Sequence, residues 1–119
     1  MRVLLVDDNA MNVELFLAAL AADGHDVAVE RDGPTGRERA LREAFDVVIL
    51  DVQLPGMDGN AVCRHLRAAG IRSPILALSS AAMADQVERG LAAGFDRYLT
   101  KPISPAALRT AVRAAGSAT

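Results

Sequence analysis

Three short runs of consecutive apolar residues stand out in the sequence, and each run ends at a polar or acidic residue. They are Val3–Val6 before Asp7, Val47–Leu50 before Asp51, and Ile75–Leu78 before Ser79. Apolar runs without alternation are typical of strands that are covered on both faces, as in a parallel sheet flanked by helices. We therefore expect three central strands, each with a polar residue at its carboxyl end.

Helical patterns alternate with these strands and with two more polar strand-like segments. The helices are expected to begin after Asn9, at Gly33-Pro34, after Asn60, near Ala84 and at Pro105, and the two further strands to cover Val27–Glu30 and Arg97–Thr100. Caps and helix-starting prolines support these boundaries. Regular alternation predicts an α/β fold: a doubly wound, five-stranded parallel sheet of order 2-1-3-4-5 with helices on both faces.

The helix expected over residues 84–93 differs from the others in its composition. Val87 and Leu91 are its main apolar anchors, and Gly90 lies in its interior. A glycine inside a helix costs on the order of 1 kcal/mol relative to alanine. We expect this helix to be among the softest in the protein.

Length, charge and hydrophobicity limit the possible functions. The 119 residues fit one domain spanning 1–119, and a net charge of −2 gives no electrostatic support for direct nucleic-acid binding. The longest apolar run, Leu15–Ala22, is too short to cross a membrane, and the start Met1-Arg2-Val3 lacks a signal-peptide layout. The lone Cys63 is expected to be a small, buried or half-buried side chain in its reduced form. These features predict a cytoplasmic protein without a membrane role.

The predicted fold brings several reactive groups to one edge of the sheet. If the strands are parallel, Asp7-Asp8, Asp51, Ser79 and Lys101, the only lysine, all follow strand ends at the same edge. Three carboxylates in one crevice repel one another unless cations intervene. Lys101 supplies one positive charge, and Mg²⁺, which prefers oxygen ligands, could supply the rest.

An aspartate beside a metal and a lysine is a suitable nucleophile for phosphoryl transfer, which would give an aspartyl phosphate. Ser79 could then hydrogen-bond the phosphate. Each residue alone has an ordinary explanation: an aspartate as a helix cap or turn residue, Ser79 as a turn residue, and Lys101 as a solvated charge. Their convergence from four strand ends favours a site.

Four motifs give the chain a resemblance to a known family. They are Val6-Asp7-Asp8-Asn9, the stretch Leu50–Gly59, Leu78-Ser79-Ser80-Ala81, and Tyr98-Leu99-Thr100-Lys101-Pro102. From Arg2 to about Ala115 the chain resembles the response-regulator receiver domains of the CheY-like superfamily, in particular those that consist of a single domain. The resemblance implies their flavodoxin-like fold.

The resemblance also implies a role for each acidic residue. Asp51 would be the phosphoacceptor and a ligand of Mg²⁺. Asp8 would bind the metal directly, Asp7 through a water molecule, and Gln53 through its backbone carbonyl.

For the remaining motif residues, the resemblance implies roles in phosphate binding and switching. Lys101 would contact the phosphoryl group, and its peptide bond to Pro102 would be cis. Ser79 would be the switch hydroxyl and Tyr98 the switch aromatic.

Two further positions would tune how long the phosphoryl group lasts. In the family, the side chains two residues past the phosphoacceptor and two past the switch hydroxyl help to place the hydrolytic water. Here they are Gln53 and Ala81, which are poorly suited to that task. We expect slow self-dephosphorylation.

The resulting interpretation is a single-domain response regulator of a two-component system or phosphorelay. A sensor histidine kinase or a histidine phosphotransfer protein would phosphorylate it, and its fourth helix, fifth strand and fifth helix would bind a downstream protein. It would catalyse only its own phosphorylation and dephosphorylation. The Met1 start and an expected frayed tail from Gly116 favour a free-standing protein.

Three alternatives remain open. The chain could be a receiver domain excised from a hybrid histidine kinase. A metal-dependent aspartyl-phosphate phosphatase would carry a second acid where Gln53 stands. A flavodoxin-like mononucleotide-binding module would carry a hydroxyl- and glycine-rich loop where this chain has Asp7-Asp8.

Overall fold

The computed structural model describes residues 1–80 and 83–117, which fold around one five-stranded sheet. The strands are β1 Arg2–Val6, β2 Asp26–Glu30, β3 Val47–Asp51, β4 Ile75–Ser79 and β5 Arg97–Thr100. Every neighbouring pair is parallel, and the order is β2-β1-β3-β4-β5. The predicted fold class and strand order are confirmed.

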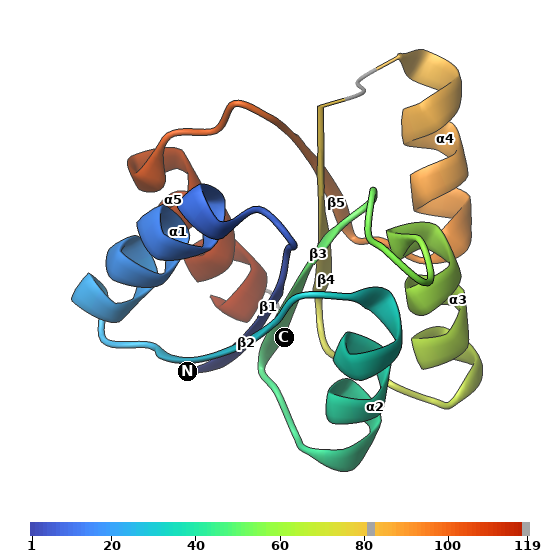
Figure 1. Cartoon of the computed structure of the whole chain (residues 1–119), viewed down its shortest axis with the longest axis horizontal. Helices are drawn as coiled ribbons and strands as arrows, with labels where there is room; N and C mark the ends of the chain where they lie inside the picture. The colour runs from blue at the N-terminus through green and yellow to red at the C-terminus, as the bar shows by residue number, and fades with distance from the viewer. Residues whose placement is uncertain (81–82, 118–119) are drawn as a thin grey trace.

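Helices cover both faces of this sheet (Figure 1). Helices α1 (Ala10–Ala22) and α5 (Pro105–Ser117) pack together on one face. The opposite face carries α2 (Gly33–Arg42), α3 (Gly59–Ala68) and α4 (Ala84–Ala93). The sheet is therefore the middle of three layers, which explains why its central strands are apolar on both sides.

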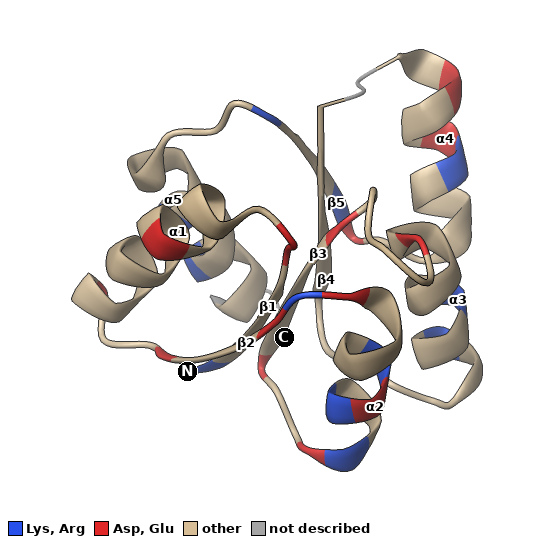
Figure 2. Cartoon of the chain, in the orientation of Figure 1, with Lys and Arg blue, Asp and Glu red and all other residues tan. Residues whose placement is uncertain are grey.

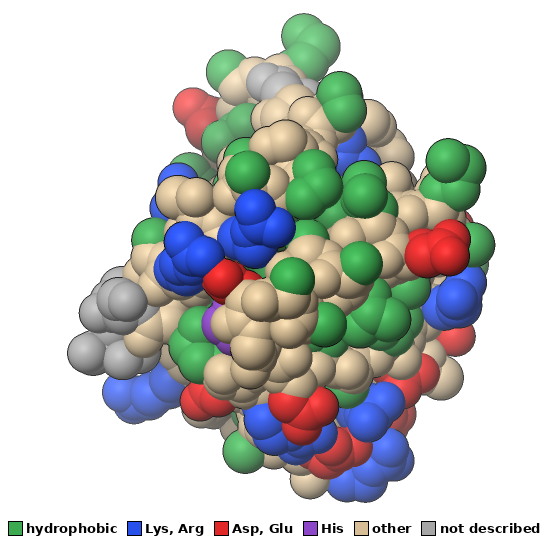
Figure 3. Space-filling view, turned by 90° about the vertical axis from the view of Figure 1, so that its left-hand side faces the viewer, with side chains coloured by type: hydrophobic (Ala, Val, Ile, Leu, Met, Phe, Trp, Pro, Cys, Tyr) green, Lys and Arg blue, Asp and Glu red, His purple; other side chains and the backbone are tan. Residues whose placement is uncertain are grey.

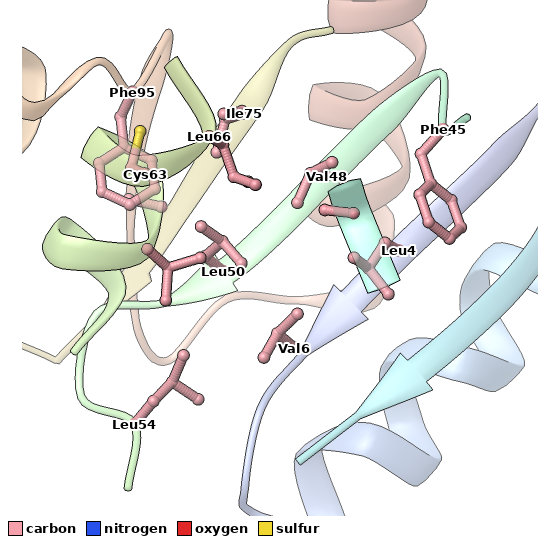
Figure 4. Close-up of a cluster of buried hydrophobic side chains, with 13 residues drawn as sticks. Leu4, Val6, Phe45, Val48, Leu50, Leu54, Cys63, Leu66, Ile75 and Phe95 are labelled. Carbon is pink, nitrogen blue, oxygen red and sulfur yellow. The ribbon is translucent and has the colours of Figure 1, made fainter. Parts of the chain in front are cut away.

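The core consists of two clusters, one on each face of the sheet. Neighbouring residues of a strand point to opposite faces, so each central strand contributes to both clusters. The cluster beneath α3 includes Leu4, Val48, Leu50, Leu66 and Ile75 (Figure 4), and the cluster beneath α1 and α5 includes Leu5, Phe16, Ile49, Leu76 and Leu108. Cys63 belongs to the first cluster and is fully buried, as predicted.

Most helix starts follow the sequence, with one exception. The side chains of Asn9 and Ser104 accept hydrogen bonds from the first turns of α1 and α5, as predicted. Asn60 does not cap α3, because that helix already begins at Gly59 and its cap is Asp58. Instead Oδ1 of Asp58 accepts a hydrogen bond from the backbone N–H of Ala61 at 2.9 Å. The prediction of Asn60 as the cap is wrong.

Two helix ends also differ slightly from the prediction. The sequence pattern of the second helix extends to about Ala44, but α2 ends at Arg42. Helix α5 continues through Gly116 to Ser117, so part of the segment predicted to fray is helical, while residues 118–119 lie outside the described part of the chain.

Helix α4 has the predicted bounds but not the predicted anchors. The side chain of Leu91 is 49% exposed, and Val87 is only half-buried. The buried residues of α4 are Gly90 and Ala93, and Gly90 lies against Tyr98 of β5. The prediction that Leu91 anchors this helix is wrong because the buried face is made by small residues.

Arg67 links the end of α3 to the segment before β4 and to the turn between α4 and β5. Its Nε donates to the carbonyl oxygen of Gly94 at 3.0 Å, and one terminal nitrogen, Nη2, donates to Oδ2 of Asp96 at 2.7 Å. Its other terminal nitrogen, Nη1, donates to the carbonyl oxygens of Ile71 and Ser73 at 3.0 and 2.9 Å. One side chain thus fixes the segment before β4 and the turn after α4 to the same point.

The surface made by α1 and α5 is rich in apolar side chains (Figure 3). Met11 and Leu15, one helical turn apart on α1, are 80% and 49% exposed. Helix α1 is therefore apolar on its outer as well as its inner face. In the described residues, none of the helices has both the length and the hydrophobicity needed to span a membrane.

Candidate functional site

The structure brings together the strand-end residues that the sequence singled out. Asp7 directly follows β1, Asp51 and Ser79 are the last residues of β3 and β4, and Lys101 directly follows β5. Because β1, β3, β4 and β5 are parallel neighbours, all four residues lie at the carboxyl edge of the sheet. Figure 2 shows acidic segments where β1 and β3 end.

Three carboxylates form the centre of this edge. Asp7 and Asp51 are buried, whereas Asp8 is exposed. One oxygen atom from each of the three side chains lies within 4.8 Å of the other two. The arrangement combines a buried acidic pair with a third acid that is open to solvent.

Backbone N–H groups orient both buried carboxylates. The N–H of Asn9 donates to Oδ1 of Asp7 at 2.9 Å, and the N–H of Gln53 donates to Oδ1 of Asp51, also at 2.9 Å. In each case the donor is two residues after the aspartate, so the turn that ends the strand also fixes the carboxylate. The Oδ2 atoms of both residues face Lys101.

Lys101 supplies the positive charge nearest to the acidic pair. Its Nζ lies 2.7 Å from Oδ2 of Asp51 and 3.2 Å from Oδ2 of Asp7. Its backbone N–H donates to the carbonyl oxygen of Ser79 at 2.8 Å, which holds the loop after β5 against the end of β4. The Lys101–Pro102 peptide bond is cis, as predicted.

Burial dominates the electrostatics of the site. It raises the pKa of the Asp51 carboxyl above its ordinary value, and the hydrogen bonds from Lys101 and Gln53 offset it only in part. Burial also acts to lower the pKa of Lys101, but the hydrogen bond and charge of Asp51, together with Asp7, outweigh it and the pKa is raised. The single lysine therefore does not fully compensate the buried carboxylates, and the site favours a further cation.

The donor set fits a hard divalent metal ion. Three carboxylates converge, all with oxygen donors, and Mg²⁺ is usually held by one or two carboxylates together with water and phosphate oxygens. Asp8 is open to solvent, so an ion could enter from that side.

The two predicted switch residues border a common cavity. Ser79 is buried at the end of β4, and Tyr98 of β5 is half-buried against the core cluster beneath α3. Both line a cavity of about 130 Å³, together with Gln53, Gln86 and Arg89. The Oγ of the neighbouring Ser80 donates to Oε1 of Gln53 at 3.4 Å. Ala81, the second residue predicted to tune dephosphorylation, lies outside the described residues.

Sequence reasoning missed the part that Gly59 plays in shaping the site. A Cβ atom at Gly59 would lie 2.4 Å from the carbonyl oxygen of Asp51 and 2.8 Å from Cα of Val52. Only a glycine lets α3 begin this close to the end of β3. The sequence shows Gly59 only as the last residue of the motif stretch Leu50–Gly59, and no local pattern indicates that it lies against Asp51.

The fold and the site together define a receiver domain, and the chain belongs to the family described as "Response regulator receiver domain", whose profile matches residues 3–113. It is thus a receiver domain of the kind found in two-component response regulators. Such domains receive phosphoryl groups from histidine kinases.

Particular relatives agree with this assignment. Over 114 residues the chain is 40% identical to the response regulator PleD of Caulobacter vibrioides, covering 94% of this chain and 25% of PleD. It is 42% identical over 108 residues to the sensor protein GacS of Pseudomonas syringae, covering 87% of this chain and 12% of GacS. The chain therefore spans a quarter or less of the length of these two relatives.

A solved structure matches nearly end to end. It is the receiver domain of the sensor histidine kinase PA1611 from Pseudomonas aeruginosa, with a magnesium ion coordinated in its active-site cleft. The TM-score is 0.91 at 34% identity, and the match covers 98% of each chain.

Proposed function

We propose that this receiver domain accepts a phosphoryl group on Asp51. The observation that carries the proposal is the convergence of Asp7, Asp8, Asp51 and Lys101 at one sheet edge, with Nζ of Lys101 2.7 Å from Oδ2 of Asp51. An oxygen of the Asp51 carboxylate would attack the phosphorus atom of the donor. The bond between phosphorus and the donor atom would break, and the phosphoryl group would remain on Asp51 as a mixed anhydride.

The surrounding residues would prepare the site for this transfer. Lys101 would balance part of the negative charge on the phosphoryl oxygens, while the backbone N–H of Gln53 would hold the carboxylate in position. Asp8, Asp51 and the backbone carbonyl of Gln53 would hold Mg²⁺, with Asp7 acting through water. Bound Mg²⁺ would neutralise charge on the phosphoryl oxygens. The magnesium ion in the cleft of the PA1611 receiver domain supports this assignment.

The switch would begin at Ser79 and Tyr98. Once Asp51 is phosphorylated, the hydroxyl of Ser79 would hydrogen-bond the phosphoryl group, and Tyr98 would move further into the interior. The surface formed by α4, β5 and α5 would then repack and bind a downstream protein. A local change of charge would thus bias a two-state equilibrium.

The phosphodonor would be a histidine kinase or a histidine phosphotransfer protein. The likeness to the sensor proteins GacS and PA1611 supports this class of partner. We propose that the domain acts as a single-domain response regulator, catalysing only its own phosphorylation and slow dephosphorylation, and that its output passes through protein contacts and not through nucleic acid. A role as one domain of a hybrid kinase is the alternative that these relatives also support.

The phosphoacceptor can be tested with a small-molecule donor. Incubation with acetyl phosphate and Mg²⁺ should add one phosphoryl group, detected by intact mass and removed by hydroxylamine. Asp51→Asn should add none, because an amide is not a nucleophile at this position. Asp26→Asn, at a surface aspartate whose side chain is 80% exposed, is the control and should react like the wild type. A stable adduct on the Asp51→Asn protein would refute the assignment.

A further inference from the structure

Gly90 lies in the middle of α4, directly beside the ring of Tyr98. A Cβ atom at position 90 would lie 2.8 Å from both Cδ2 and Cε2 of that ring, and 3.6 Å from Cδ2 of Phe95. Contacts of a Cβ atom below about 3.0 Å are essentially not found in proteins. The ring of Tyr98 can rest against the backbone of α4 only because position 90 has no side chain.

The backbone of α4 does not itself require a glycine here. Gly90 is not among the glycines with positive φ, whereas Gly94, at the end of the same helix, has a φ of 117°. Inside a helix, glycine is unfavourable by on the order of 1 kcal/mol relative to alanine. The packing of the Tyr98 ring explains why this position carries the less favourable residue.

The position of the ring connects α4 to the phosphoacceptor edge. Tyr98 borders the cavity of about 130 Å³ that Ser79 and Gln53 also line. Tyr98 is half-buried and does not belong to the fully buried core, so a change in its position need not disrupt that core. The contact that holds the Tyr98 ring against α4 therefore determines the position, close to Ser79, from which the ring would move.

We propose that Gly90 is a positioning residue for Tyr98: it provides the space in which the ring rests against α4 while Asp51 is unphosphorylated. The proposal deepens the proposed function, since it rests on Tyr98 responding to phosphorylation. Filling that space with a methyl group displaces the ring before any phosphoryl group arrives. Overpacking of this kind disfavours the original arrangement on the order of tenfold.

The sequence provides a direct probe of this arrangement. Tyr98 is the only tyrosine, and the chain contains no tryptophan. Intrinsic tyrosine fluorescence and its quenching by acrylamide therefore report on this ring alone. In the wild type, we expect quenching to decrease when acetyl phosphate and Mg²⁺ are added, because the ring moves inward.

The test compares Gly90→Ala with the wild type before and after phosphorylation. The unphosphorylated variant should already differ from the wild type in quenching, and phosphorylation should change its quenching less. The amount of phosphoryl group bound should stay the same, since Gly90 touches no group of the acidic site. Equal quenching of the two proteins in both states would overturn the proposal.

A matched control separates packing from helix propensity. Ala92→Gly changes the propensity of the same helix by a similar amount in the opposite direction, at an exposed position. It should leave Tyr98 quenching unchanged. If Ala92→Gly altered quenching as strongly as Gly90→Ala, general softness of α4 would be the cause and the proposal would fail.

A second measurement needs no phosphoryl group. In a Tyr98→Ala background the space beside position 90 is free, so Gly90→Ala should raise the melting temperature through its better helix propensity. With Tyr98 present, the same change should give a smaller rise or a fall. An equal rise in both backgrounds would contradict the packing role. Because this comparison and the resting fluorescence do not involve phosphorylation, they still decide the role of Gly90 if Asp51 proves not to be a phosphoacceptor.

Discussion

The ammonium nitrogen of Lys101 lies 2.7 Å from Oδ2 of Asp51, although 50 residues separate the two in the sequence. The same nitrogen lies 3.2 Å from Oδ2 of Asp7. One cation thus joins two buried carboxylates that end two different strands. The parallel arrangement of β1, β3, β4 and β5 makes this contact possible, because it puts all their carboxyl ends at one edge.

Lys101→Met should destabilise the protein in the absence of metal. Methionine keeps much of the length of the side chain but leaves Asp7 and Asp51 without their countercharge, at a cost of about 3 kcal/mol. Urea unfolding with a chelator measures this loss, and added Mg²⁺ should restore more stability to the variant than to the wild type. Arg89→Met is the control, since the ion pair of Arg89 with Asp85 is about 70% exposed on both sides and should contribute less than about 0.5 kcal/mol. Equal losses in the two variants would show that Lys101 is only a surface charge.

Asp8→Ala should weaken Mg²⁺ binding without weakening the metal-free fold. Asp8 is exposed, and the cap of α1 is Asn9, so no helix start depends on the Asp8 side chain. Removing one of three neighbouring carboxylates also reduces their repulsion. Calorimetric titration with Mg²⁺ and thermal unfolding in chelator check the two parts. A marked drop in the metal-free melting temperature would mean that Asp8 is chiefly structural.

Cys63 should be unreactive in the folded protein, and its buried thiol should make the protein less stable at alkaline pH. Burial raises the pKa of its thiol from 9.0 to about 11. The folded state therefore holds the proton more tightly than the unfolded state, so stability is fully present below pH 9.0 and falls by roughly 2–3 kcal/mol as the pH rises to about 11. The difference between wild type and Cys63→Ala in urea unfolding from pH 8 to 11 isolates this effect. Rapid reaction of the native thiol with a disulfide reagent at pH 8 would show that the side chain is accessible.

The phosphorylated protein should lose its phosphoryl group slowly. The side chain of Gln53 is a neutral amide and a poor general base, and alanine at position 81 cannot hold a water molecule. Ala81→Glu should speed the decay by at least about tenfold, measured as the loss of the hydroxylamine-sensitive adduct over time. Ala22→Glu, on the exposed end of α1, is a suitable control for the added charge. Decay of the wild type within seconds, or an unchanged rate in Ala81→Glu, would contradict this account of its lifetime.

The sequence predicted which residues meet because burial and strand direction decide that question. Uninterrupted apolar runs locate the central strands, and parallel pairing then brings Asp7, Asp51, Ser79 and Lys101 to one edge whatever their rotamers. The contacts between individual atoms do not follow from this pattern. Which carboxylate oxygen faces Lys101 depends on the turns in which Asn9 and Gln53 donate their N–H groups.

The errors occurred where tertiary packing chooses between locally equivalent options. Asp58 and Asn60 are both good caps, and the choice is made by the close approach of Gly59 to the backbone of Asp51. Leu91 suits a buried helix face, but the contact of Gly90 with Tyr98 sets the rotation of α4 and leaves Leu91 at the surface. Both decisions involve a glycine that contacts a residue eight positions away, on a different secondary-structure element.

The hydrogen bonds of Arg67 have a mechanical consequence for α4. They hold the turn at Gly94 and the segment before β4 to the end of α3. Helix α4, about 15 Å long, is therefore fixed at its C-terminal end and freer to move at its N-terminal end. A push from the side of Tyr98 would then make α4 pivot about Gly94, with the largest swing at Ala84. Hydrogen exchange in the last turn of α4 should accordingly be faster in Arg67→Met than in the wild type, while exchange in its first turn should change less. The largest movement of α4 would then occur at the same edge of the sheet where Asp51 lies.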